Sequence, residues 1–145
     1  MTERNKTLTK VKLADITLKI GSGATPKGGK ESYQGSGITL IRSLNVYDFN
    51  FEYKDLAFIN DQQAKELANV SICKNDVLLN ITGASVARCC IVPNHLIPAR
   101  VNQHVAIIRV NEKLANPFYI LYCINSPYYK HRLLSLAQSG ATREG

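Results

Sequence analysis

Short runs of β-branched and aliphatic residues fill the first two-thirds of this sequence and limit what it can fold into. Glycine, proline or asparagine interrupts them, and they have the length and composition of strands at 38–44, 51–59, 77–82, 89–92 and 105–110. In the last third, Asn116-Pro117 and Ser126-Pro127 each place a capping residue before a proline, which predicts helices over 118–125 and 128–139. This order predicts an α/β protein of the α+β type: a mixed, twisted β-sheet with helices packed against it, two of them at the C-terminus.

Three other segments complete the prediction. Apolar residues at 11, 13, 16 and 20 predict a short helix that ends at Gly21. Four glycines and a proline make residues 21–30 a basic loop. Asn60 and Gln63 form a capping-box pattern, which predicts a helix from 61 to about 68.

The length of 145 residues fits one domain with its own core. We expect residues 1–10 to be a flexible N-terminal segment and 11–145 to form the domain. The net charge of +7 is uneven, because residues 1–30 and 81–145 each carry +5 and residues 31–80 carry −3. The two basic blocks either solvate the surface or meet in the fold as a site for a polyanion.

The cysteines favour a reducing compartment. Cys73, Cys89, Cys90 and Cys123 include no Cys-x-x-Cys pair, and no histidine stands at zinc-finger spacing. The N-terminus has no apolar signal region, and no apolar run reaches the ~18–20 residues of a membrane span. We therefore expect buried thiols, no metal site, no membrane association and a cytoplasmic location.

The sequence contains partial matches to three functional motifs, and each either lacks required residues or has a structural explanation. Gly28-Gly29-Lys30 lacks the remaining residues of a phosphate-binding loop, and Pro26 occupies the third glycine position of a dinucleotide fingerprint. Asn116-Pro117-Phe118-Tyr119 approaches the turn of adenine methyltransferases, but helix capping explains it. We expect a protein that is not an enzyme, with no catalytic residues and no cofactor.

Several segments, taken in order, resemble one known family. Gly23-Ala24-Thr25-Pro26 is similar to its Gly-x-Thr-Pro, and residues 75–83 are similar to its Gly-Asp-Ile-Leu-x-x-x-x-Gly. The other matching segments are 11–16, 38–43, 102–105 with 107–109, and 139–142. Over about 135 residues this order resembles one target recognition domain of the specificity subunit of type I restriction-modification enzymes.

The resemblance implies a non-catalytic DNA reader. It implies double-stranded DNA as a partner, together with the methyltransferase (modification) subunit and, through it, the restriction subunit. Family members carry two recognition domains separated by long spacer helices. Because this sequence stops where the first spacer helix is expected, we expect a single-domain fragment or a truncated subunit that reads one half of a bipartite target.

Candidate DNA contacts follow from side-chain chemistry. Base reading needs two fixed hydrogen-bonding atoms, so the candidates are Arg42, Asn45, Asn102 and Gln103. Phosphate or secondary contacts are expected from Ser22, Thr25, Lys27, Lys30, Tyr33, Thr82, Ser85, Arg88, Arg100 and Arg143. Alternatively, Thr25 and Thr82 satisfy the backbone of turns. Asn102 and Gln103 could instead cap the start of the 105–110 strand. Tyr128 and Tyr129 are interpreted as packing residues.

Two other function classes stay open. A stand-alone nucleic-acid binder that prefers RNA would use the same basic surface. A protein-interaction module would instead present an exposed apolar patch, for which Leu133, Leu134 and Leu136 are the candidates.

Overall fold

The structure is a computed structural model that describes residues 9–139. Its strands are β1 (Thr17–Ser22), β2 (Ile38–Ile41), β3 (Val46–Tyr47), β4 (Asn50–Phe51), β5 (Ala57–Ile59), β6 (Val77–Asn80), β7 (Cys89–Ile91), β8 (Ala99–Val101) and β9 (Val105–Val110). The α-helices are α1 (Asp61–Glu66), α2 (Pro117–Asn125) and α3 (Pro127–Ser139), and five short 3-10 turns connect the other elements.

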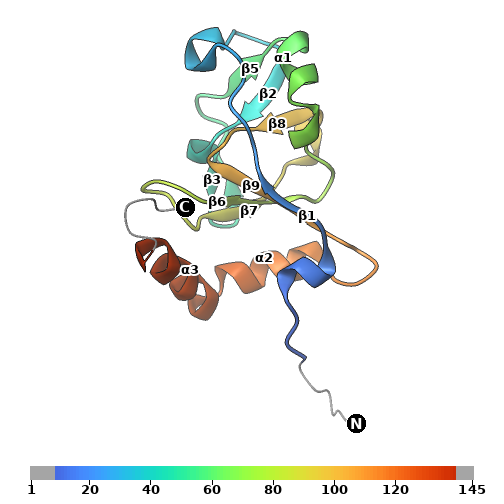
Figure 1. The fold of residues 1–145 in the computed structure, drawn as a ribbon, viewed down its shortest axis with the longest axis vertical. Helices are drawn as coiled ribbons and strands as arrows, with labels where there is room; N and C mark the ends of the chain where they lie inside the picture. The colour runs from blue at the N-terminus through green and yellow to red at the C-terminus, as the bar shows by residue number, and fades with distance from the viewer. Residues whose placement is uncertain (1–8, 140–145) are drawn as a thin grey trace.

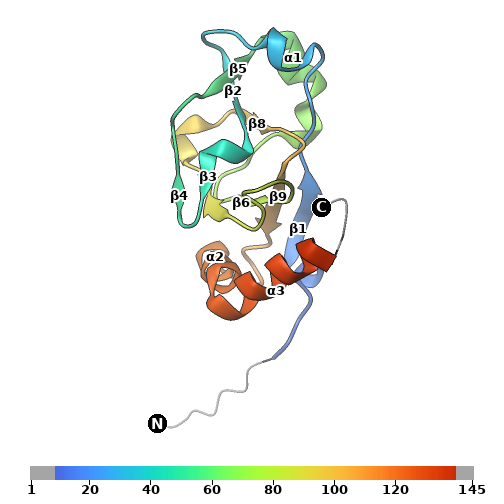
Figure 2. The same ribbon diagram turned by 90° about the vertical axis from the view of Figure 1, so that its left-hand side faces the viewer.

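The strands form three sheets (Figure 1). The largest is antiparallel, in the order β1-β9-β6-β7, and the second is mixed, in the order β5-β2-β8 with β2 and β8 parallel. β3 and β4 make a small hairpin. Helices α2 and α3 lie against the large sheet at one end of the molecule, and α1 lies with β2 and β5 at the other (Figures 1 and 2). The predicted α+β class with two C-terminal helices is confirmed, although the strands divide among three sheets.

The large sheet is buried on both faces, which explains its continuous apolar runs. Alternate residues of a strand point to opposite faces. Leu78 and Ile107 accordingly belong to the core shared with the three-stranded sheet, whereas Val77 and Ile108 belong to the core shared with α2. One loop of the candidate site follows β6 of this sheet, and the other two follow β2 and β8 of the three-stranded sheet.

The helix predicted over 11–20 is wrong. Residues 13–16 form only a 3-10 turn, and the following residues are strand β1, which pairs with β9 in the register Ile20↔Ile108. Pairing with a strand almost 90 residues away supplies the backbone hydrogen bonds that a local helix would have supplied, and tertiary context overrides a weak local pattern in this way.

The remaining elements follow the predictions with shifted ends. The predicted 38–44 strand ends at Ile41 because residues 43–45 form a 3-10 turn, and the 51–59 segment divides into β4 and β5. Strand β8 was not predicted. The capping box is confirmed, since the Asn60 side chain accepts from the Gln63 amide at 2.8 Å and Gln63 Oε1 accepts from the Asn60 amide at 3.0 Å.

Candidate nucleic-acid interface

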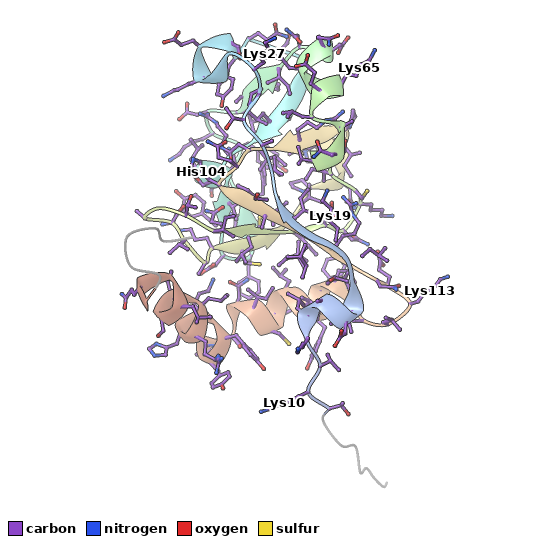
Figure 3. The ribbon with its side chains drawn as sticks, viewed as in Figure 1. Lys10, Lys19, Lys27, Lys65, His104 and Lys113 are labelled. Carbon is purple, nitrogen blue, oxygen red and sulfur yellow. The ribbon has the colours of Figure 1, made fainter. Side chains whose placement is uncertain are left out.

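Three loops that are far apart in the sequence meet around one open hollow of about 450 Å³. They follow β2, β6 and β8, and the hollow is lined by Ser43, Leu44, Tyr47, Thr82, Gly83, Ala84, Ser85, Arg88 and His104. His104 marks this side in Figure 3, and Figure 2 views the molecule from the same side. The hollow therefore brings together the 42–45 region, the 100–104 region and three of the predicted secondary contacts: Thr82, Ser85 and Arg88.

A buried amide ties two of these loops together. Asn80 ends β6 and is 1% exposed, and its Nδ2 donates to the Ser43 carbonyl and to Ser85 Oγ, both at 3.0 Å. Its backbone also bonds to both Ala87 and Arg88, at 2.8 and 2.9 Å, which closes the 81–87 loop. Asn80 thus links Ser43 and Ser85, two residues that line the hollow. Its Oδ1 has no hydrogen-bond partner among the described residues.

The third loop is fixed by similar bonds. The Asn102 side chain, 6% exposed, accepts from the His104 amide at 3.0 Å, while the His104 carbonyl accepts from the Ile81 amide at 3.1 Å. Thr82 Oγ1 and His104 Nδ1 are 2.5 Å apart. The alternative role of Asn102 at the start of the 105–110 strand is therefore confirmed, and the exposed neighbour Gln103 is the member of that pair with an accessible side chain.

Asn45 does not suit base reading in this fold. It is fully buried, its Oδ1 accepts from the Arg42 amide at 3.0 Å, and its Nδ2 donates to the carbonyls of Glu52 and Lys54 at 2.9 and 3.1 Å. Both amide protons are used inside the protein, so the prediction that Asn45 reads a base is corrected to a role in holding the 42–54 segment together.

Arg42 is also engaged within the protein. Its guanidinium lies 5.4 Å from the centre of the Tyr33 ring and donates to the Asp55 carbonyl, while its Nε is buried without a partner. Tyr33 packs against the main core. A DNA contact by Arg42 or Tyr33 stays a prediction. To contact DNA, the Arg42 guanidinium would have to leave the Tyr33 ring and the Asp55 carbonyl.

The basic loop lies at the opposite end of the molecule from α2 and α3, as Lys27 shows in Figure 3. Lys27, Lys30, Ser22 and Thr25 are all exposed. The loop is anchored because Gln63 Nε2 donates to the Lys27 carbonyl at 2.9 Å. Phosphate contacts by these four side chains stay predictions.

Gly23 starts the turn with the family-like motif because a side chain has no room there. An added Cβ would lie 2.0 Å from the Val101 carbonyl oxygen, and the amides of Gly23 and Ala24 donate to the carbonyls of Val105 and Val101. The close approach positions the basic loop against β8 and β9.

Arg100 is half-buried and links β8 to α1. Its Nε donates to the Ala64 carbonyl at 2.9 Å and its Nη1 to the Ala99 carbonyl at 3.0 Å, and burial lowers the pKa of its guanidinium. A phosphate contact by Arg100 stays a prediction. Arg143 lies outside the described residues, as does most of the 139–142 segment.

Sequence reasoning predicted Thr82, Ser85 and Arg88 but missed three other residues at the hollow. Tyr47, Asn80 and His104 were not among the candidates. Asn80 carried a signal, because it is a polar residue inside the apolar 77–81 run. Tyr47 carried none, since only the fold places its ring beneath Arg88, with 4.4 Å between the guanidinium carbon and the ring centre.

Other functional chemistry is limited in the described part of the chain. Within residues 9–139, no group of three or more His, Cys, Asp or Glu side chains is placed to hold a metal ion. Burial raises the pKa of the Cys90 thiol to about 12 and that of Cys89 further, so both stay protonated at neutral pH. No helix among these residues is long and apolar enough to span a bilayer.

The exposed apolar residues of α3 match the prediction in part. Leu134 and Leu136 are 40% and 60% exposed, as expected, whereas Leu133 packs against the α2 core. Tyr128 and Tyr129, interpreted from the sequence as packing residues, are 62% and 48% exposed and contact each other edge to face. With Tyr119 and Tyr122 of α2, 62% and 63% exposed, they form an aromatic face on the two C-terminal helices.

The sequence matches no protein-family model and no curated protein. Among solved structures, the chain is similar to the HsdS subunit from Thermoanaerobacter tengcongensis, with a TM-score of 0.61 and 15% identity over 84% of this chain and 27% of that one. It is also similar to a chain from a study of the complex assembly and conformational transition of the type I R-M system, with a TM-score of 0.58 and 17% identity over 82% and 26%.

The chain thus spans about a quarter of the length of the chains it resembles. At these identities the similarity establishes a shared fold. The fold implied by the resemblance is therefore confirmed, as one shared with part of the HsdS subunit.

Proposed function

We propose that this chain is a DNA-recognition domain that reads one half of a bipartite target for a type I restriction-modification complex. The observation that carries the proposal is the hollow, where three loops place hydroxyl, imidazole and guanidinium groups side by side on a fold shared with HsdS. Such donors and acceptors, held on a rigid sheet, suit the edges of base pairs in a groove.

The charge distribution supports a duplex as the ligand. Lys27 and Lys30 are exposed on the basic loop, where each neutralises one phosphate without disturbing the core. In the proposed function the exposed Ser22 and Thr25 make neutral phosphate contacts, and the exposed Gln103 contacts a base edge. In this function phosphate contacts orient the duplex, and the hollow selects the sequence.

The same proposal gives the chain its partners. We infer a non-catalytic role in the cytoplasm, where catalysis belongs to the methyltransferase subunit and, through it, to the restriction subunit. The aromatic face on α2 and α3 supports the second candidate, a protein-interaction module, because exposed tyrosines are enriched where proteins dock.

A salt titration with the purified chain tests the proposed function. Fluorescence anisotropy with labelled duplex DNA should give dissociation constants of roughly 10⁻⁴–10⁻⁶ M that weaken steeply from 50 to 200 mM salt. A matched RNA duplex serves as competitor and should displace the DNA poorly. Affinity that ignores salt, or that favours RNA, would contradict the proposal, and the absence of any nucleic-acid binding would favour the interaction module.

A further inference from the structure

Arginine is the side chain that most often reads guanine, and residues 9–139 contain five. Three of them donate guanidinium N–H groups to the protein: Arg42 to Asp55, Arg100 to Ala64 and Ala99, and Arg109 to Asp76. Arg88 and Arg132 are different, because no hydrogen bond among the described residues occupies their guanidinium N–H groups. Each lies over a tyrosine ring, as Arg42 does.

Arg88 is the one of these two that lines the hollow. Its guanidinium carbon is 4.4 Å from the centre of the Tyr47 ring, against 5.9 Å for Arg132 over Tyr128. Stacking uses the face of the guanidinium plane, whereas hydrogen bonds use its edge. The contact with the Tyr47 ring therefore restrains the guanidinium and leaves its N–H donors available to a ligand.

The backbone beneath the stack is held from both sides. The Arg88 amide donates to the Ser85 carbonyl at 3.2 Å, and the Arg88 carbonyl accepts from the Asn80 amide at 2.9 Å. Tyr47 is the last residue of β3, and Arg88 directly precedes β7. A side chain on such supports loses less conformational freedom on binding than one on a mobile loop.

Lys130 of α3 joins the residues next to Tyr47 and Arg88. Lys130 Nζ lies 2.8 Å from Asp48 Oδ1 and also donates to the Ala87 carbonyl, and the same Asp48 oxygen accepts from the Cys89 amide at 3.2 Å. Asp48 follows Tyr47, and Ala87 and Cys89 flank Arg88. One lysine thus fixes the spacing between ring and guanidinium.

We propose that Arg88 is a specificity-determining residue of this chain and reads a guanine by donating two hydrogen bonds from its guanidinium edge to O6 and N7. Tyr47 supports the stack, and Lys130 with Asp48 are positioning residues. The proposal rests on the proposed function and adds the base class to it. An arginine fork binds a phosphate as well as a base edge. The hydroxyl and imidazole groups of Thr82, Ser85 and His104 line the same hollow as Arg88, and this mixture of donors and acceptors favours a base edge.

The test is a selection with the purified chain on a duplex library that carries a randomised window. Wild-type protein should enrich guanine at one position of the window. Arg88→Ala should reduce that preference roughly 5- to 150-fold and leave the other positions unchanged. Arg88→Lys, which keeps the charge, should keep the salt dependence and still lose most of the preference, and it decides the test if Arg88→Ala fails to fold.

Arg132→Ala is the matched control, because it removes an arginine stacked on tyrosine outside the hollow and should leave the preference intact. Lys130→Met should weaken the guanine preference while duplex binding persists, and Lys130→Arg should restore it. Tyr47→Phe keeps the ring and should behave as wild type.

The outcomes separate the two proposals. Absence of any duplex binding overturns the proposed function and the role of Arg88 with it. Duplex binding without a guanine preference, or with one that Arg88→Ala leaves unchanged, overturns the role of Arg88 alone. Equal weakening of all sequences by Arg88→Ala would make Arg88 a phosphate contact and would also overturn it.

Discussion

Replacing Asn45 by alanine distinguishes a structural amide from a base-reading one. The side chain is fully buried and makes three hydrogen bonds, to the Arg42 amide and to the carbonyls of Glu52 and Lys54. Each such bond contributes a net ~0.5–1.5 kcal/mol, so the three together contribute roughly 2–4 kcal/mol. Because Glu52 and Lys54 are near the surface, water replaces part of the loss at their carbonyls. We expect a loss of about 2–3 kcal/mol in the free energy of unfolding.

Urea unfolding measures this loss directly. The chain has seven tyrosines and no tryptophan, so tyrosine fluorescence and far-ultraviolet circular dichroism report the transition. The midpoint should fall while the slope with urea concentration stays constant, because the same surface unfolds. The melting temperature should fall by about 6–10 °C for a domain of this size.

Asn50→Ala is the matched control for this experiment. Asn50 lies in the β3–β4 hairpin that directly follows Asn45 and is exposed, so its replacement should change stability by less than about 0.5 kcal/mol. If Asn45→Ala were as stable as Asn50→Ala, the assignment of Asn45 to the interior would be wrong. A stable Asn45→Ala variant that lost sequence preference would return Asn45 to the reading face.

Three further predictions test the fold and the basic loop. Arg109→Leu should cost about 3 kcal/mol or more in urea unfolding, because it leaves the fully buried Asp76 carboxylate without its cation; a loss below about 1 kcal/mol would contradict this. Gly23→Ala should sharply lower the melting temperature, whereas Gly35→Ala, with nothing within 4 Å of the added Cβ, should not; equal melting would refute the close approach. Lys27→Ala should weaken all duplexes equally and lower the salt slope by about 0.9, as anisotropy would measure, and a sequence-dependent loss would argue against a phosphate contact.

Local patterns predicted the parts of the fold that are decided locally. The capping box at Asn60 and the capping at Asn116 depend on side chains and amides two or three residues apart, and both form as the sequence indicates. Strand β1 depends instead on β9, and no pattern within residues 11–20 records that partner. The same limit applies to β8, a three-residue strand at the edge of its sheet that pairs only with the distant β2.

The candidate site was predictable as a region and not residue by residue. The 42–45 and 100–104 segments do meet at the hollow, joined by the 82–88 loop. Within them, the sequence favoured asparagine because its amide matches adenine. A loop that leaves a buried strand also needs amides, since its own backbone groups must be satisfied without water. Sequence alone cannot tell which of the two uses an asparagine serves.

Burial decides between these uses in this chain. Asn45, Asn80 and Asn102 are all nearly inaccessible, and each donates to or accepts from the backbone of a loop at the hollow. The amides therefore hold the loops, and in the proposed function the base contacts are made by side chains whose polar edges stay outside. Arg88 meets that condition because an aromatic face, which offers no competing acceptor in the guanidinium plane, supports it. By this reasoning a change of target base requires replacement of Arg88 or Gln103, whereas replacement of the three asparagines changes stability.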